Sequence, residues 1–335
     1  MQPIALVCPI CRGALEQRPD SYFCALDQRI YPVTFGIPDL HAFSSSNLAS
    51  KVEYAKATRL IAEYPRRTST ELMELYYSIS PEIPARLAKK YIVHNSTGVV
   101  RAKSALAEVQ RHSRSYSTDA FLEIGCGTGE FLVAATQVFD QVVGLDIEMC
   151  WLVIAKKQLE EAGRAATLAC ACAEHLPLSD SSFQLAVARD VIEHVEAPTE
   201  LLREAYRVLR RNGTLFLSTP NRWSLALEPH VKVWGVGFLP KAWRSPYVRL
   251  VRKIPYESIN TLSYFDVRRL LADTSFEQRR VLLPSLPSEH TARLSAWERR
   301  VVSIYHALKG LWPVSWLVYL FGPLFHIICT KAERD

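Results

Sequence analysis

Hydrophobic residues in the last two thirds of the chain fall into short unbroken runs that alternate with segments of helical spacing. Runs bounded by turn residues predict buried strands, at 120–124, 142–146, 185–188, 214–218 and 324–331. Segments with apolar residues on one helical face predict helices, at 99–111, 130–138, 200–209 and 266–274. Strands that alternate with helices in this way predict an α/β fold with a doubly wound sheet.

The first 98 residues do not follow this alternation. Serines and an asparagine at 44–47 indicate a linker or helix cap, and 51–63 and 71–77 have helical patterns. These helices are expected to pack between two domains or to cover a substrate pocket. We therefore divide the chain into an N-terminal module (1–42), a helical connector or cap (43–98) and an α/β domain (99–335). The α/β domain contains one insertion (222–262).

Composition adds the class of protein and its compartment. With 49% hydrophobic and 22% charged residues, the chain can bury a globular core, and its net charge of +6 permits contact with RNA or an anionic membrane without requiring either. The eight cysteines are scattered in a way that suits a reducing compartment better than a disulfide framework. The N-terminus shows no signal-peptide pattern, so we expect a cytoplasmic protein.

The strongest local signal follows the strand at 120–124. Three glycines at spacing two, Gly125, Gly127 and Gly129, allow a turn with positive φ and close approach of a ligand to the backbone. The next strand ends in Asp146, placed to accept from ribose hydroxyls. Glu123 would repel the pyrophosphate of a dinucleotide but suits a ligand that carries an ammonium or sulfonium charge.

These residues resemble motif I of the class I S-adenosylmethionine-dependent methyltransferases, and the similarity continues through most of 99–331. The resemblance implies a Rossmann-like sheet of seven strands that binds S-adenosylmethionine. It assigns the cofactor site to one set of residues: Glu123, Gly125, Cys126, Gly127, Gly129, Asp146, Ile147, Cys172, Ala173, Glu174 and Asp190. In the family an acid commonly accepts from the adenine amino group where this chain has Cys172, and Gln184 replaces a second acid, which leaves adenine recognition to the backbone around Ala173.

The segment after the fourth predicted strand contains the candidate catalytic residues Asp190, Glu193 and His194. On a helical turn Asp190 and either partner would face one cavity, and His194 would serve as general base. The trio resembles the acid-x-x-Glu-His cluster of ubiquinone-pathway O-methyltransferases, where these positions bind a divalent metal. The alternative is a structural role, in which the Glu-His pair caps a helix and orients the backbone.

The N-terminal module has the spacing of a zinc ribbon, with Cys8 and Cys11 followed by Cys24. The fourth ligand would be Asp27, an unusual oxygen ligand beside three thiolates. The segment 31–40 resembles the small zinc-ribbon-like domain that activates some tRNA and protein methyltransferases. The resemblance implies a β-rich fold, which either binds zinc or keeps its cysteines as small buried hydrophobes.

Two segments bear on the methyl acceptor. The insertion at 222–262 mixes aromatic residues with lysines and arginines, which fits a lid over a hydrophobic small molecule or lipid, a membrane contact, or RNA. The run 310–330 has no charge and reaches the length of a membrane span, but Pro313 and Pro323 divide it. We expect it to form a buried or interfacial helix and the last strand, with peripheral membrane contact left open.

Together these features favour O-methylation of a hydrophobic or phenolic small molecule or lipid. An RNA methyltransferase with a zinc module is the first alternative, weakened by the missing fourth Cys or His. A non-catalytic adaptor that keeps the cofactor fold is the second, and the intact glycine turn with Asp146 argues against it. The sequence does not indicate an oligomeric state.

Overall fold

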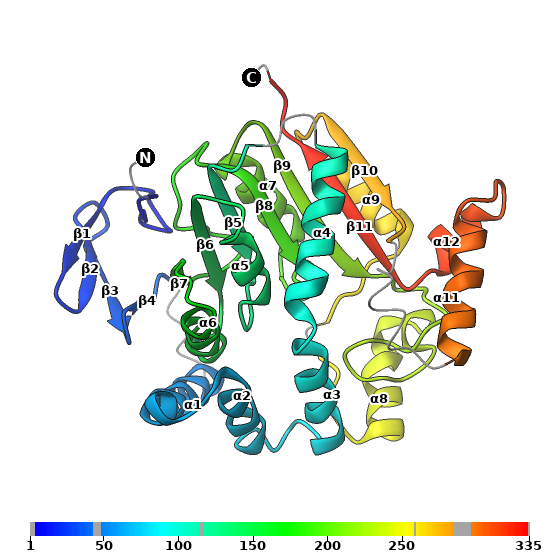
Figure 1. Cartoon of the computed structure of the whole chain (residues 1–335), viewed down its shortest axis with the longest axis horizontal. Helices are drawn as coiled ribbons and strands as arrows, with labels where there is room; N and C mark the ends of the chain where they lie inside the picture. The colour runs from blue at the N-terminus through cyan, green and yellow to red at the C-terminus, as the bar shows by residue number, and fades with distance from the viewer. Residues whose placement is uncertain (1–3, 43–47, 114–116, 258, 285–295, 334–335) are drawn as a thin grey trace.

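The computed structural model describes residues 4–42, 48–113, 117–257, 259–284 and 296–333. Its centre is a seven-stranded sheet with the order β10-β11-β9-β8-β5-β6-β7 (Figure 1). These strands are β5 (Ala120–Ile124), β6 (Gln141–Asp146), β7 (Thr167–Cys170), β8 (Phe183–Arg189), β9 (Leu209–Pro220), β10 (Gln278–Leu282) and β11 (Leu324–Thr330). Neighbours from β7 to β9 run parallel, whereas β11 is antiparallel to both β9 and β10. The predicted doubly wound, seven-stranded α/β fold is confirmed.

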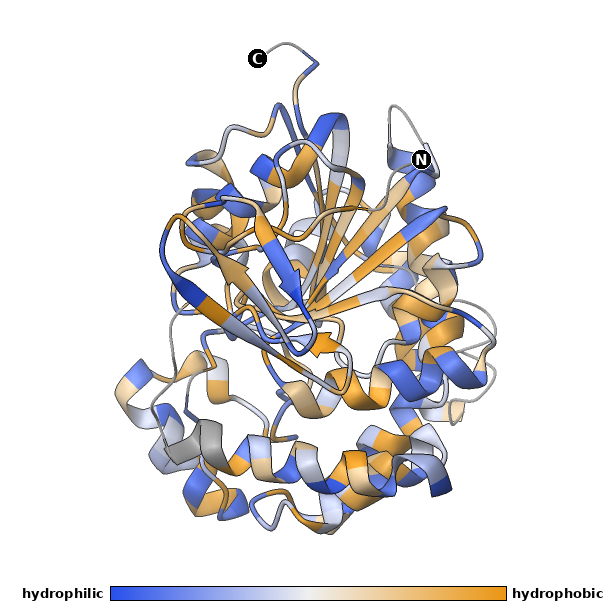
Figure 2. Ribbon diagram, turned by 90° about the vertical axis from the view of Figure 1, so that its left-hand side faces the viewer, coloured by the Kyte–Doolittle hydropathy of each residue, from blue (hydrophilic) through white to orange (hydrophobic). Residues whose placement is uncertain are grey.

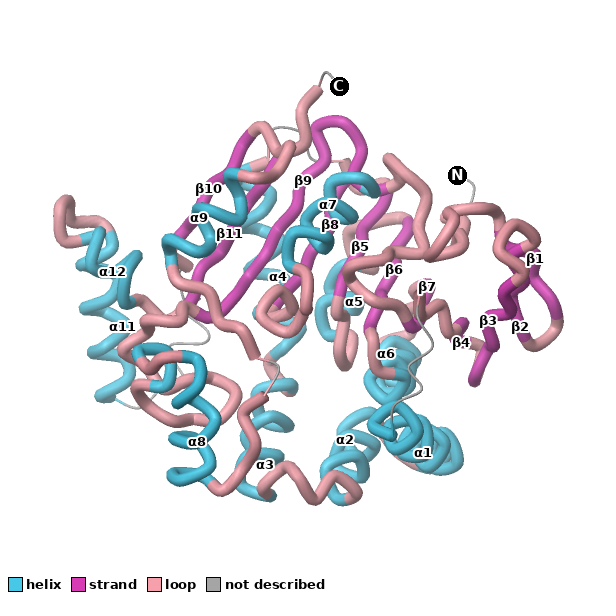
Figure 3. Tube along the Cα trace, turned by 180° about the vertical axis from the view of Figure 1, so that it is seen from behind, coloured by secondary structure: helices cyan, strands magenta, loops and turns pink. Residues whose placement is uncertain are grey.

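Helices cover both faces of this sheet. One face packs against α4 (Gly98–His112), α5 (Glu130–Ala135) and α6 (Met149–Glu161) in one hydrophobic cluster. The other packs against α7 (Pro198–Val208) and α9 (Tyr264–Ala272) in a second cluster, and Figure 3 shows these two helices in front of the strands. Hydrophobic residues are concentrated along the strands between the two layers, as Figure 2 shows.

Several predicted boundaries were wrong by a few residues. The first crossover helix ends at Ala135 rather than at 138. The helix predicted at 200–209 ends at Val208, because Leu209 pairs with Phe183 and begins β9, which therefore starts five residues before the strand predicted at 214–218. Residues 190–194 are not helical. They form a turn that is closed by the hydrogen bond from His194 N to Val191 O.

The N-terminal module is a small antiparallel sheet. Its strands are β1 (Leu15–Arg18), β2 (Ser21–Cys24), β3 (Arg29–Thr34) and β4 (Ile37–Pro38). Just after β4 the chain joins the edge of the large sheet, where Asp39 pairs with Cys170 and Leu40 N donates to Cys170 O at 2.7 Å. The module is therefore attached beside the end of β7, on the edge where β6 also ends.

Helices α1 (Leu48–Glu63), α2 (Ser69–Ser78) and α3 (Ala85–Asn95), with the 3-10 turn η1 (Tyr64–Arg66), follow. The helices predicted at 51–63 and 71–77 lie within α1 and α2, whereas the predicted linker at 44–47 lies outside the described residues. Tyr76 of α2 packs on Trp151 of α6 with ring centroids 4.4 Å apart. The predicted division into three parts stays a prediction.

The remaining elements lie at the opposite end of the sheet. The insertion contains η2 (Val236–Phe238) and α8 (Lys241–Arg252), and the C-terminal region contains α11 (Ala296–Lys309) and α12 (Ser315–Phe321). The run 310–330 thus forms the short helix α12 and the last strand β11, as expected. Within the described ranges, every helix is too short or too polar to cross a lipid bilayer.

Candidate cofactor and acceptor sites

The glycine turn leads from β5 into α5 with backbone angles that favour glycine. Gly125, Gly127 and Gly129 have φ of +70°, +50° and +85°. A Cβ on Gly125 would lie 2.3 Å from Cγ2 of Val191, whereas a Cβ on Gly127 would meet no atom within 4 Å. Val191 therefore packs against the turn at Gly125, whereas the space beside Gly127 is empty and can hold a ligand.

Glu123 lies at the end of β5 and is 4% exposed. Its Oε2 is buried and has no hydrogen-bond partner among the described residues. Burial raises the pKa of this carboxyl well above its usual range, and the charge of Arg189 opposes that shift. An unpartnered buried acid is costly, so its presence beside the open turn fits a site for a ligand ammonium.

Asp146 at the end of β6 reaches across the glycine turn. Its Oδ2 accepts from Gly127 N at 2.8 Å and its Oδ1 from Glu148 N at 3.0 Å, which fixes the carboxylate at the strand edge. The next residue, Ile147, is 57% exposed and offers an apolar surface. His41 of the N-terminal module approaches Ile147 O with Nε2 at 3.1 Å, so this module contributes to the same edge.

Only part of the segment predicted to bind adenine, 172–174, can contact a ligand. Cys172 and Ala173 are half-buried next to the end of β7. The Glu174 carboxylate instead accepts from Glu196 N at 3.1 Å, just before α7, so its side chain supports that helix. Cys126 is buried beneath the glycine turn, and burial raises the pKa of its thiol well above the usual value. These positions offer a ligand mainly backbone groups.

The structure separates the three candidate catalytic residues. Asp190 accepts from Ser218 Oγ at 3.2 Å, and Glu193 accepts from Thr219 Oγ1 at 3.0 Å. Ser218 and Thr219 are consecutive in β9, so their side chains point to opposite faces of the sheet. Asp190 therefore lies on the α4 face, while Glu193 lies on the face that carries α7 and α9.

Glu193 and His194 gather with a residue that the sequence did not indicate, His230 of the insertion. The ligand atoms of these three residues lie within 4.8 Å of one another. His194 Nε2 is 3.1 Å from His230 Nε2, and His230 Nδ1 is 2.6 Å from Glu228 Oε1. We call these four residues the lid cluster. No motif links residues 36 positions apart, so only the fold reveals His230.

Three residues of the lid cluster have pKa values shifted from their usual range. Burial, reinforced by Asp190, raises the pKa of Glu193 to about 8. Burial, reinforced by His230, lowers the pKa of His194 to about 4. Burial acts downward on His230 as well, but the bond to Glu228 reverses the effect and its pKa rises. Two imidazoles and a carboxyl with an unpartnered Oε1 form a donor set that suits a divalent transition metal.

The cysteines of the N-terminal module also converge. The ligand atoms of Cys8, Cys11, Cys24 and Asp27 lie within 4.8 Å of one another. Gly13 N donates to Cys11 Sγ at 3.4 Å, and this bond lowers the pKa of that thiol. Asp27 Oδ2 lies 3.0 Å from Cys8 Sγ. Three sulfurs and one carboxylate oxygen at this separation fit a single tetrahedral ion.

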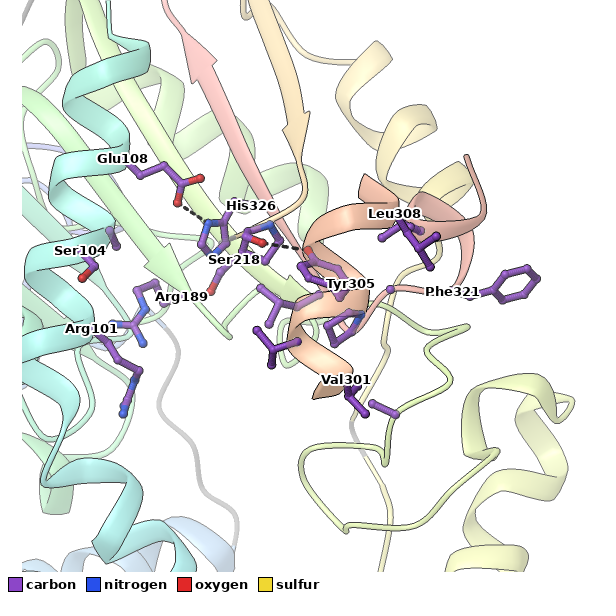
Figure 4. Close-up of a pocket in the computed structure, with 18 of the residues that line it drawn as sticks. Arg101, Ser104, Glu108, Arg189, Ser218, Val301, Tyr305, Leu308, Phe321 and His326 are labelled. Atoms are coloured by element: carbon purple, nitrogen blue, oxygen red, sulfur yellow. Dashed lines mark hydrogen bonds and ion pairs between the residues drawn. The ribbon is translucent and has the colours of Figure 1, made fainter. Parts of the chain in front are cut away.

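A cavity of about 1110 Å³ opens next to the cofactor edge, between α4, the ends of β8, β9 and β11, and the pair α11–α12. Its polar end contains Arg101 and Glu108 of α4, Arg189, Asp190 and His326 (Figure 4). Hydrophobic residues of α11 and α12 form the other wall. Of the candidate catalytic residues only Asp190 lines this cavity, and the lid cluster lies outside it.

Residues 122–217 match a family model described as a methyltransferase domain. The chain is 27% identical over 135 residues to a ubiquinone biosynthesis O-methyltransferase of Idiomarina loihiensis. The aligned segment covers 40% of this chain and 53% of that protein. It is 28% identical over 171 residues to an uncharacterized protein of Methanocaldococcus jannaschii, covering 51% of this chain and 71% of that protein.

Among solved structures, the chain is similar to phosphoethanolamine N-methyltransferase 2 of Haemonchus contortus in complex with S-adenosyl-L-methionine. The two share 16% identity at a TM-score of 0.44, over 68% of this chain and 52% of the other. The chain spans about half the length of the ubiquinone-pathway relative, at 53%. The segment that matches the family model, 122–217, runs from β5 into β9.

Proposed function

We propose that the protein is an S-adenosylmethionine-dependent methyltransferase that O-methylates a hydrophobic or phenolic small molecule or lipid. The observation that carries the proposal is Glu123, a buried carboxyl with an unpartnered oxygen beside an open glycine turn. The methionine end of S-adenosylmethionine supplies the ammonium that this acid lacks. The methyltransferase domain over 122–217 contains the same turn.

Each part of the cofactor has residues to hold it. Asp146, fixed by two backbone amides, accepts from the ribose hydroxyls. Ile147 offers its exposed side chain to the adenine ring, and backbone near Cys172 and Ala173 meets the adenine edge. Arg101 lines the cavity, where its Nη1 donates to His94 O and Thr97 Oγ1, and the rest of its guanidinium would bind the methionine carboxylate. This arginine belongs to no motif that the sequence indicated.

The bound cofactor supplies an electrophilic methyl group on a sulfonium sulfur. The protein's part is to align the acceptor oxygen with that methyl and to exclude water, because a direct displacement needs little else beyond a base for a protonated nucleophile. The α3 helix supports such closure. Its Asn95 donates to Thr128 of the glycine turn at 2.5 Å, and its Tyr91 donates to His230 O of the insertion at 2.9 Å.

The acceptor class follows from the cavity. Its α11–α12 wall is apolar, and its polar end meets the cofactor edge. Relatives named ubiquinone biosynthesis O-methyltransferases support an O-methylated acceptor of this kind. We place the acceptor in this cavity, with Asp190 at its inner end.

Two metal sites belong to the proposal. The N-terminal cluster would hold zinc through Cys8, Cys11, Cys24 and Asp27. The divalent ion predicted at Asp190, Glu193 and His194 would instead use Glu193, His194 and His230, since Asp190 faces the cavity. There it would join the insertion to the catalytic domain.

Calorimetry with S-adenosylmethionine tests the cofactor assignment. The Asp146→Ala variant should bind at least about 100-fold more weakly, because it loses two hydrogen bonds from the ribose hydroxyls to a charged group, each worth about 1.5–3 kcal/mol. Asp140→Ala, an acid before β6 and away from the turn, is the matched control. Folded wild-type protein that binds no cofactor would refute the proposal. Incubation with tritiated cofactor and fractionated cell extract then shows whether label enters lipid, small-molecule or RNA fractions.

A further inference from the structure

We propose that His326, held by Glu108, is the general base that removes the proton from the acceptor hydroxyl. The proposal rests on the methyltransferase function proposed above and goes further by naming a catalytic residue and the chemical class of its substrate. The acceptor it implies is an apolar molecule with an ionisable hydroxyl, such as a phenol. Neither residue belongs to the motifs found in the sequence.

The two side chains form an oriented pair within the cavity. His326 Nδ1 lies 2.7 Å from Glu108 Oε2, and the side chains are 17% and 15% exposed. Burial opposes ionisation of Glu108, but the bond to His326 outweighs it and lowers the pKa of the carboxyl. An ionised carboxylate at Nδ1 keeps the proton on that nitrogen, so Nε2 is left as an acceptor. The ring of Phe216, 5.0 Å from the imidazole, fixes its orientation further.

The sheet register aligns His326 with the cofactor edge. Arg189 of β8 pairs with Ser218 of β9, and Ser218 pairs with His326 of β11. Paired residues point to the same face, here the face beneath α4, and neighbouring strands lie about 4.8 Å apart. His326 is therefore about 10 Å from Arg189 along this row, which leaves room for a substrate oxygen between them.

Glu123, the acid proposed to bind the cofactor ammonium, lies on the same face of the sheet. Glu123 of β5 pairs with Val187 of β8, two residues before Arg189. The methyl donor and the proposed base thus flank one continuous row of side chains. Arg189 lies over the ring of Phe131, 5.3 Å from its centroid, and lines the cavity, where its charge would stabilise the oxyanion that develops as the proton leaves.

The rest of the cavity selects an apolar body. Val301, Leu308, Leu317 and Phe321 line it from α11 and α12. Tyr305 donates its hydroxyl to Pro284 O at 2.9 Å, so its ring adds to the same apolar wall while its polar atom is satisfied. A hydroxyl near the β8–β9–β11 row and a hydrophobic body along α11–α12 would fill both ends.

His194 is the competing base, and its position argues against it. It lies outside the cavity, and its Nε2 faces His230 Nε2 at 3.1 Å. His326 instead lines the cavity where the acceptor would lie, and among the described residues only Glu108 bonds to its ring, through Nδ1.

The reaction balances without a further reactant. The hydroxyl O–H bond breaks as its proton moves to His326 Nε2, and an oxygen lone pair forms the new O–CH3 bond. The S–CH3 bond breaks, and its electron pair stays on sulfur, which becomes a neutral thioether. The imidazolium, stabilised by Glu108, then releases its proton to water.

Binding of 4-nitrocatechol gives a readout that does not depend on turnover, because its absorption spectrum distinguishes phenol from phenolate. With S-adenosylhomocysteine present, we expect the wild-type protein to bind the probe as phenolate at a pH where the free probe is largely neutral. His326→Gln should abolish the phenolate band and Glu108→Gln should weaken it. Lys103→Gln, an exposed position on the same helix and outside the cavity lining, should keep it. A cofactor-loaded wild-type protein without the band overturns the proposal.

Turnover of 4-nonylcatechol with tritiated S-adenosylmethionine completes the test. Transfer of a proton by a positioned base contributes about 10²–10⁴-fold, so His326→Gln should lower kcat at least 100-fold and remove the acidic limb of the pH profile. Glu108→Asp should restore more activity than Glu108→Gln. Cofactor affinity is measured on the same samples. Loss of cofactor binding in the wild type would refute the proposed function, whereas undiminished methylation by His326→Gln would refute only the base.

Discussion

Two histidine–carboxylate clusters flank β9, and they differ in what surrounds them. Glu108 and His326 lie on the α4 face and border a large cavity. The lid cluster lies beyond the other face, anchored by Thr219, with two imidazoles turned toward each other. The same residue types thus line a cavity on one side, where we propose proton transfer, and form a closed network or a metal site on the other.

The role of each histidine depends on what its second ring nitrogen faces. In the Glu108–His326 pair the carboxylate occupies Nδ1 of a histidine that lines the cavity. In the lid cluster Glu228 likewise occupies Nδ1 of His230, but His194 meets the other nitrogen. A metal ion placed among these atoms would satisfy both imidazoles and Glu193 at once.

The largest expected effect contrasts the two histidines directly. His326→Gln should reduce kcat for 4-nonylcatechol at least 100-fold, because it removes a base that acts in the transition state. His194→Gln should reduce it less than about tenfold, since His194 acts through the insertion and lies outside the cavity. Steady-state kinetics of both purified variants measure the difference. Equal losses would mean that both clusters serve the chemistry.

The next effect concerns metal binding by the lid cluster. His230→Ala should remove one of three ligands and abolish zinc binding there, and Glu228→Gln should weaken it about 10–100-fold by releasing the ring of His230. Titration with zinc and a chelating dye measures both, in a Cys8→Ala background that disables the N-terminal site. Glu108→Gln is the matched control. Zinc affinity that survives His230→Ala would leave the lid cluster as a hydrogen-bond network.

A third effect uses the pH dependence of stability. Burial raises the pKa of Glu193 from the model-peptide value of 4.5 to about 8, so the folded state keeps a proton that the unfolded state loses. The resulting stability is fully present below pH 4.5 and declines as pH rises through about 8.

Glu193→Gln, which resembles the protonated acid, should therefore unfold at nearly the wild-type temperature at low pH. Above pH 8 it should be more stable than the wild type by up to a few kcal/mol. Thermal unfolding of the metal-free proteins across this pH range measures the gap. A gap that stays constant with pH would show that Glu193 is ionised in the folded protein.

The smallest expected effect lies on the surface of the insertion. Trp243 and Leu250 of α8 are 67% and 81% exposed, next to Arg249 and Arg252. Such a surface would add a weak attraction for anionic lipid. Leu250→Ser should lower sedimentation with phosphatidylserine vesicles by a few fold. Leu26→Ser, equally exposed on the N-terminal module at 76%, should leave it unchanged.

Local signals made the cofactor half of the site predictable. The spacing Glu123-x-Gly125-x-Gly127 and the acid at Asp146 lie at strand ends, where parallel neighbours bring them together. The boundaries were less predictable. Leu209 reads as the end of a helix by its neighbours, but its pairing with Phe183 makes it strand, and pairing across the sheet is not visible in a local pattern.

The acceptor half depended on contacts over long sequence distances. Glu108 and His326 are 218 residues apart, and His194 and His230 are 36 apart. The predicted trio of Asp190, Glu193 and His194 is contiguous in sequence, yet consecutive residues of β9 draw its members to opposite faces. Proximity in sequence was therefore a poor guide to which side chains share a cavity.

The sequence by itself determined the α/β fold, the glycine turn and the acids that suit S-adenosylmethionine, because these follow from short-range periodicity and strand ends. Only the tertiary structure decided which histidine borders the acceptor cavity and which one closes on the insertion. The physical reason is that strand order and register set the face of the sheet on which each side chain lies. The glycine turn thus points to the methyl donor, and the row Arg189–Ser218–His326 points to the acceptor.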